Sequence, residues 1–160
     1  MSPQQDSLYV NQLLASKDFF ERSTRVLEEP DSNFRPHDGM MTAAQQVAHA
    51  AQTLEWFIEG ASRPEGFDLD FARHAAEVNA VTSLAAARQW MGKAYANAIQ
   101  FFRSHTAEEL AKPLPPGPVM GGQPIRDIAW GMIEHTAHHR GALTVYSRLL
   151  GKVPVMPYAG

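Results

Sequence analysis

Three of the seven histidines fall within five residues near the C-terminus, in the run H-T-A-H-H. His135 and His139 in this run are four positions apart. In an α-helix that spacing leaves two side chains about 40° apart on one face, one turn from each other. Two neutral imidazoles in this arrangement can bind one metal ion. The spacing therefore predicts two of the ligands of a metal site.

The two histidines also fall on the face of the helix that should be buried. They interrupt an apolar stripe that repeats every three or four residues and comprises Ile128, Met132, His135, His139, Leu143, Tyr146 and Leu150. Burying an imidazole is unfavourable unless its nitrogens find partners. A shared metal ion would be one such partner, and buried carbonyl groups or water would be another. The H-x-x-x-H spacing alone leaves both interpretations open.

A third metal ligand would have to come from another helix, and His49 is the best candidate. It is the only histidine in the second predicted helix, but a helical wheel places it beside Trp56. That position lies just outside the edge of the apolar face formed by Val47, Leu54 and Ile58. Periodicity therefore supports His49 only weakly, and a half-exposed polar residue is the alternative.

The other histidines are not expected to bind metal. His37 and His74 fall in loops or short turns, and His105 falls at the end of the third predicted helix, so we expect solvated side chains. His138 is turned away from His139 by about 100° and is expected at the surface.

Four main helices are expected, at residues 7–27, 42–60, 83–105 and 124–150. Thr42 with Gln45, and Thr106 with Glu109, match the capping box that begins a helix. The proline- and glycine-rich residues 113–122 form a loop, and Pro124 is predicted as the first residue of the last helix.

The connection between the second and third helices, residues 62–81, is long for a helical bundle, where about two to eight residues usually suffice. A long crossover lets the two helices run parallel. The expected fold class is therefore all-α, a four-helix bundle that can be up-down-down-up. Residues 71–78 are predicted to form a short helix within the crossover.

Composition narrows the possible functions. The 160 residues suit one domain, residues 1–160, with a net charge of -3 and no basic patch, so no nucleic-acid partner is expected. Cysteine is absent, so a metal site must use histidine, carboxylates or water. The sequence has neither an apolar run long enough for a membrane span nor a recognisable leader, and we expect a cytoplasmic protein without a membrane partner.

Several catalytic motifs are missing. Thr136 follows His135, so the H-E-x-x-H pattern of zinc proteases and its general-base glutamate are absent. No E-x-x-H pair supports a di-iron centre. Neither a phosphate-binding glycine loop nor a G-x-S-x-G nucleophile motif occurs.

Three segments together resemble the DinB-like family. The run H-T-A-H-H-R-G-A-L at residues 135–143 and the tail after it resemble that family's last helix and C-terminal end. Residues 42–57, which include His49, resemble its second helix, and P-I-x-D-I at residues 124–128 resembles the start of its fourth. One departure is Ala142, where the family often has glutamine.

The resemblance implies an up-down-down-up bundle, often a homodimer, with its metal bound by His49, His135 and His139. Some relatives are thiol S-transferases or isomerases that use a low-molecular-weight thiol such as bacillithiol, mycothiol or glutathione. The small-molecule substrate is not readable from the sequence.

Three protein ligands would leave the metal an open position for water or a thiol. The expected function is therefore a divalent-metal-binding protein, and a metal-dependent enzyme of the thiol S-transferase or hydrolase type. Imidazole ligands suit zinc, nickel or iron, and manganese is a further candidate. A non-catalytic metal-binding or sensing module is the alternative, and a bundle without metal is a third possibility.

Overall fold

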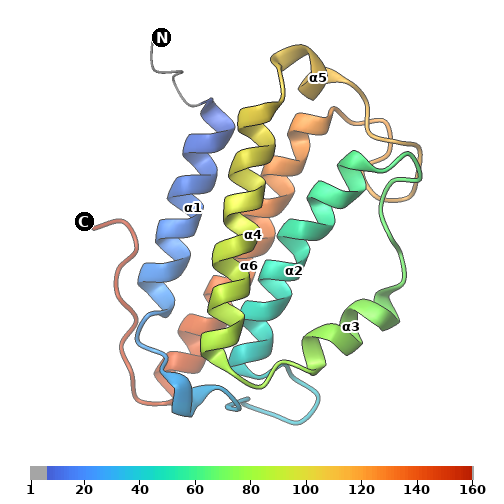
Figure 1. The fold of residues 1–160 in the computed structure, drawn as a ribbon. Helices are drawn as coiled ribbons and strands as arrows, with labels where there is room; N and C mark the ends of the chain where they lie inside the picture. The colour runs from blue at the N-terminus through green and yellow to red at the C-terminus, as the bar shows by residue number, and fades with distance from the viewer. Residues whose placement is uncertain (1–6, 160) are drawn as a thin grey trace.

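The computed structural model describes residues 7–159, and within them the chain is helical without a β-strand. Four long helices form the predicted four-helix bundle (Figure 1). They are α1 (Leu8–Thr24), α2 (Ala43–Ser62), α4 (Leu84–Ser104) and α6 (Ile128–Leu149). Shorter elements are α3 (Phe71–Asn79), α5 (Ala107–Ala111) and the 3-10 turns η1 (Glu29–Asp31) and η2 (Ile125–Asp127). In the described part of the chain, no helix combines the length and apolarity needed to cross a membrane.

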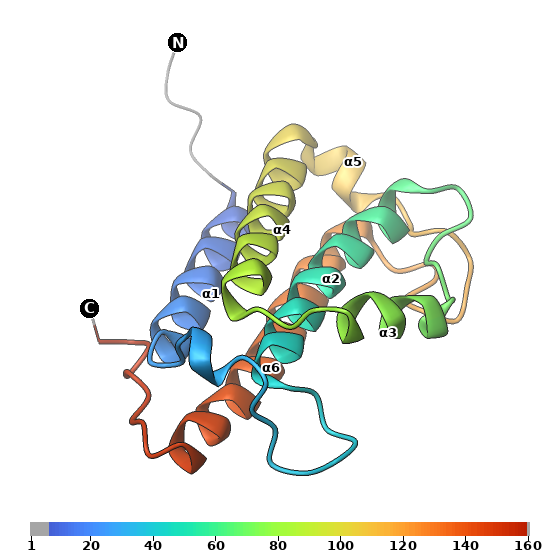
Figure 2. The same cartoon turned by 60° about the horizontal axis from the view of Figure 1, so that its bottom comes forward.

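The long helices run in two directions. Figures 1 and 2 show α1 and α6 running one way and α2 and α4 the other, which is the up-down-down-up order. The segment between α2 and α4 crosses the outside of the bundle and contains α3. The short helix expected at residues 71–78 is therefore present, one residue longer than predicted.

Side-chain caps set where the helices begin. Thr42 Oγ1 accepts a hydrogen bond from the amide of Gln45 at 3.2 Å, and Gln45 Oε1 accepts one from the amide of Thr42 at 2.9 Å. This capping box was predicted from sequence, as was the one between Thr106 and Glu109. The prediction for Pro124 was wrong in detail. It precedes η2, and α6 begins only at Ile128.

Small residues bring α2 close to its neighbours. Its alanines are fully buried at five positions: Ala43, Ala44, Ala48, Ala50 and Ala51. Helix α2 contacts α3, α4 and α6, so nearly its whole circumference is covered. Short side chains allow backbones to approach, and a longer side chain such as His49 can then reach the facing side of α6.

Candidate metal centre

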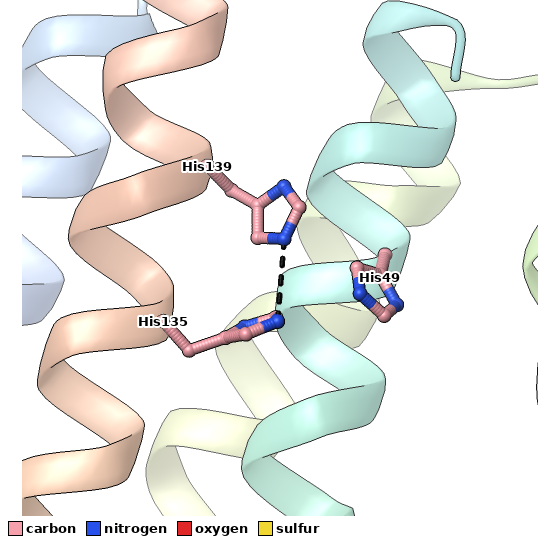
Figure 3. A group of neighbouring side chains, drawn as sticks. All are labelled: His49, His135 and His139. Carbon is pink, nitrogen blue, oxygen red and sulfur yellow. Dashed lines mark hydrogen bonds between the residues drawn. The ribbon is translucent and has the colours of Figure 1, made fainter. Parts of the chain in front are cut away.

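His49, His135 and His139 converge between α2 and α6 (Figure 3). The ring centroid of His49 lies 5.0 Å from that of His135 and 4.8 Å from that of His139. The centroids of His135 and His139 are 4.5 Å apart. One nitrogen from each ring lies within 4.8 Å of the other two. The fold therefore brings together the three histidines singled out in the sequence.

Burial keeps the three imidazoles uncharged. Only 7% of His139 is exposed, and burial together with the neighbouring rings of His135 and His49 lowers its pKa to about 3. Burial lowers the pKa of His135 to about 4, and burial also lowers the pKa of His49. At neutral pH each ring therefore has a lone pair that can bind a metal.

A directed chain of hydrogen bonds fixes which nitrogen of His139 carries that lone pair. The hydroxyl of Tyr146 donates to the carbonyl of Met41 at 2.8 Å, and Gln46 Nε2 donates to the Tyr146 oxygen at 3.2 Å. Gln46 Oε1 is thus turned towards Nδ1 of His139, which donates to it. The lone pair of the His139 ring is then on Nε2, on the side of His135. Such an outer hydrogen bond is the usual support of a metal-binding histidine.

The surroundings of His135 favour a cation over the alternative of carbonyl partners. Its Nε2 lies 3.3 Å from Nε2 of His139, while its buried Nδ1 has no hydrogen-bond partner within the described chain. A buried nitrogen without a partner is unfavourable. Neither nitrogen of His135 contacts a carbonyl within the described chain, and a metal ion could replace the contact between the two Nε2 atoms. The donor set thus fits a divalent ion that prefers imidazole.

A cavity of about 210 Å³ opens onto two of the three histidines, His49 and His135. Its other lining residues come from α2 and α3: Gln52, Thr53, Trp56, Phe57, Phe71 and His74. A small molecule in this cavity would lie directly against the histidine cluster.

The sequence model of the DinB superfamily matches residues 12–143. The chain belongs to the DinB superfamily. Among solved structures it is similar to YfiT from Bacillus subtilis, described as a probable metal-dependent hydrolase with an unusual four-helix bundle topology. The two share 14% identity at a TM-score of 0.71, and the match covers 95% of this chain and 91% of YfiT. This likeness supports the same bundle fold. No curated protein matches the chain.

Sequence reasoning missed Gln46 in this DinB superfamily member. Gln46 precedes His49 by three residues and so lies on the same side of α2. That spacing is the one local signal, because its partner His139 is 93 residues away. A glutamine in a helix ordinarily indicates a surface position, whereas this side chain is buried.

The remaining histidines lie outside the cluster. His37 and His138 are exposed, as expected, although the ring of His138 lies 5.0 Å from that of His139. His105 is half-buried rather than solvated, because its ring packs on that of Phe101 at a centroid distance of 4.2 Å. The expectation for His74 was wrong, since it is half-buried and lines the cavity. The reason is that α3 folds back against α2.

Proposed function

We propose that this protein binds one divalent metal ion through His49, His135 and His139 and uses it to activate a water molecule or a thiol. The reaction would be of the hydrolase or thiol S-transferase type. The observation that supports this most directly is the set of three neutral imidazole nitrogens within 4.8 Å of one another. Zinc, nickel, iron and manganese are the candidate ions, and a low-molecular-weight thiol is the candidate cosubstrate.

When bound, the metal would supply Lewis acidity, which can lower the pKa of water from 15.7 to about 7. Residues of the protein itself would orient the ligands and exchange protons. Gln46 and Tyr146 hold the His139 ring in one orientation, and the rings of Trp56, Phe57 and Phe71 line the space beside the cluster. His74 is the one titratable side chain among the lining residues besides His49 and His135. It is therefore the group placed to exchange a proton with a substrate in the cavity.

The cavity favours an enzyme over a non-catalytic metal-binding or sensing module. Structural zinc sites are closed by four protein ligands, whereas catalytic sites keep a position open. Here three histidines converge, and two of them line a space that a small molecule can enter. YfiT, described as a probable metal-dependent hydrolase, supports the hydrolase type. A homodimer and a cytoplasmic location stay predictions, and analytical ultracentrifugation would check the first.

The decisive experiment measures the metal content of freshly purified protein by plasma mass spectrometry. The comparison is between the wild type, His135→Ala and the control His138→Ala. His138 lies on the same helix but is exposed and outside the cluster. We expect stoichiometric metal in the wild type and the control, and its loss in His135→Ala. A wild type that takes up no zinc, nickel, manganese or iron would overturn the proposal.

A second measurement addresses turnover. Metal-loaded protein is supplied with a thiol and an electrophile, or with an ester, and the products are followed. Metal binding without either reaction would favour the binding or sensing module.

A further inference from the structure

The end of the cavity away from His49 and His135 is built from aromatic rings, and the His74 ring lies 6.4 Å from that of Phe71. Trp56, Phe57, Phe67 and Phe71 form an aromatic cluster in which the Trp56 ring centroid lies 4.6 Å from that of Phe67, 5.4 Å from that of Phe57 and 6.4 Å from that of Phe71. Trp56 is seven residues after His49 on α2, which places it two turns or about 10 Å along the helix. The cavity thus has a nitrogen-rich end and an aromatic end.

Two glycines make room for this cluster. A Cβ atom at Gly60 would collide with the ring of Phe67, and one at Gly131 would lie 2.5 Å from the ring of Phe57. The Trp56 indole is held by a hydrogen bond from its Nε1 to the carbonyl of Asp68 at 2.7 Å. The rings are therefore fixed by the backbone around them.

Helix α3 supplies the outer wall. Gln52 Nε2 donates to the carbonyl of His74 at 3.0 Å and to Glu77 Oε2 at 2.8 Å, which ties α3 to α2. Phe71, in the first turn of α3, lines the cavity yet is 61% exposed. A large aromatic side chain at the mouth, only partly covered by its own chain, leaves apolar surface that a ligand could bury.

Charge restricts what can enter. None of the residues that line the cavity is a lysine, arginine, aspartate or glutamate. A neighbouring hollow shares Gln52, Trp56 and His74 with the cavity and carries Glu55, Glu59, Glu77 and Arg73. Carboxylates outnumber cations there by three to one, so an anionic group projecting from the cavity would be repelled.

We propose that the aromatic end of the cavity binds an uncharged aromatic or similarly flat apolar group of the substrate. The polar, reacting end of the same substrate then lies against His49 and His135. This inference rests on the proposed metal function and narrows it to small, aryl-bearing substrates. It disfavours substrates whose non-reacting part is anionic.

Two hydroxamates with the same metal-binding head test the proposal. Benzohydroxamate carries a phenyl group and acetohydroxamate a methyl group, and their affinities for metal-loaded protein are measured by titration calorimetry. Burial of the ring should make benzohydroxamate about tenfold to a hundredfold tighter. A benzohydroxamate with a carboxylate in the para position should lose that gain. Equal affinities for the phenyl and methyl compounds would overturn the proposal.

The variant Phe71→Ala shows where the phenyl group binds. Phe71 is exposed, so the protein should still fold, and the quantity to follow is the ratio of benzohydroxamate to acetohydroxamate affinity. Benzohydroxamate should bind several-fold more weakly. Leu69→Ala is the control, because Leu69 is 43% exposed and close in sequence but does not line the cavity.

An experiment on metal-free protein tests the aromatic cavity independently of the proposed metal function. Benzyl alcohol lacks a metal-binding group, and saturation-transfer NMR should detect its contact with metal-free wild type and a weaker contact with Phe71→Ala. A signal that depends on Phe71, in a protein that takes up no metal, would support the aromatic cavity and refute the metal function. Normal metal uptake with no such signal would overturn the aromatic cavity alone.

Discussion

Helix α6 presents two different faces to the bundle. One carries His135 and His139 towards α2, beside the cavity of about 210 Å³. The other faces α1 across a hollow of about 460 Å³, lined from α6 by residues that include Trp130, Ala137 and Arg140. Among the described residues, no group of three potential metal ligands lines the larger hollow. Convergence of donor atoms, rather than the volume of a cavity, therefore marks the candidate site.

Each face also holds one buried nitrogen without a hydrogen-bond partner in the described chain, Nδ1 of His135 and Nη1 of Arg140. On the α2 face two further imidazoles lie next to the unpartnered group. On the α1 face the Arg140 guanidinium lies over the rings of Phe19 and Tyr158, at 5.7 and 5.8 Å from their centroids. Of these two groups, only His135 has a lone pair to offer a cation, since the Arg140 guanidinium is a donor alone.

The largest expected difference between the two faces is in how acid changes the free energy of unfolding. In the metal-free protein the pKa of His135 is lowered to about 4 and that of His139 to about 3, from 6.5 for an unperturbed histidine. Between these values and 6.5 the unfolded chain binds more protons, so the free energy of unfolding should fall as pH drops from 7 towards 4. We expect a loss on the order of a few kcal/mol, measured by urea unfolding across this range.

The same titration on His139→Leu should give a shallower pH dependence. Ala137→Leu, on the opposite face, should retain the full slope. An equal slope in wild type and His139→Leu would show that the cluster is not the cause.

The second largest effect should follow loss of the hydrogen bond to His139. Gln46→Leu keeps a side chain of similar size but removes the acceptor for His139 Nδ1. Metal affinity should fall about tenfold to a hundredfold, as is usual for partners of metal-binding histidines. A competition titration with a chromogenic chelator measures this, with Gln100→Leu on the exposed side of α4 as the control. Unchanged affinity in Gln46→Leu would mean that the ring orientation is set by packing alone.

Two glycines of α6 give a matched pair for stability. A Cβ at Gly131 would meet the ring of Phe57 on the α2 face, whereas one at Gly141 would meet nothing within 4 Å. We expect Gly131→Ala to lower the free energy of unfolding by about 1–3 kcal/mol through overpacking. Gly141→Ala should raise it by up to about 1 kcal/mol through helix propensity. Thermal unfolding distinguishes the two, and stabilisation by both substitutions would contradict the close contact at Phe57.

The two faces also differ in how far sequence predicted them. The H-x-x-x-H spacing and the apolar stripe placed His135 and His139 correctly, because a single helix fixes their relation. The wheel placed His49 on a flank, since it assumes one buried face. Helix α2 is instead covered on nearly every side by α3, α4 and α6, so a flank position such as that of His49 is still half-buried. Gln46 and His74 acquire their roles from contacts between helices, which no local pattern encodes.

The smallest effect is expected on the α1 face. Ala137→Leu adds a branched side chain where the hollow between α1 and α6 has room for it, so the free energy of unfolding should change by less than about 1 kcal/mol. Metal affinity should match the wild type within about twofold, because a residue two positions from His135 and His139 points to the opposite side of the helix. Calorimetry and the chelator titration measure the two quantities. A large loss of metal affinity in Ala137→Leu would show that the faces of α6 are coupled, and that the hollow against α1 also shapes the histidine cluster.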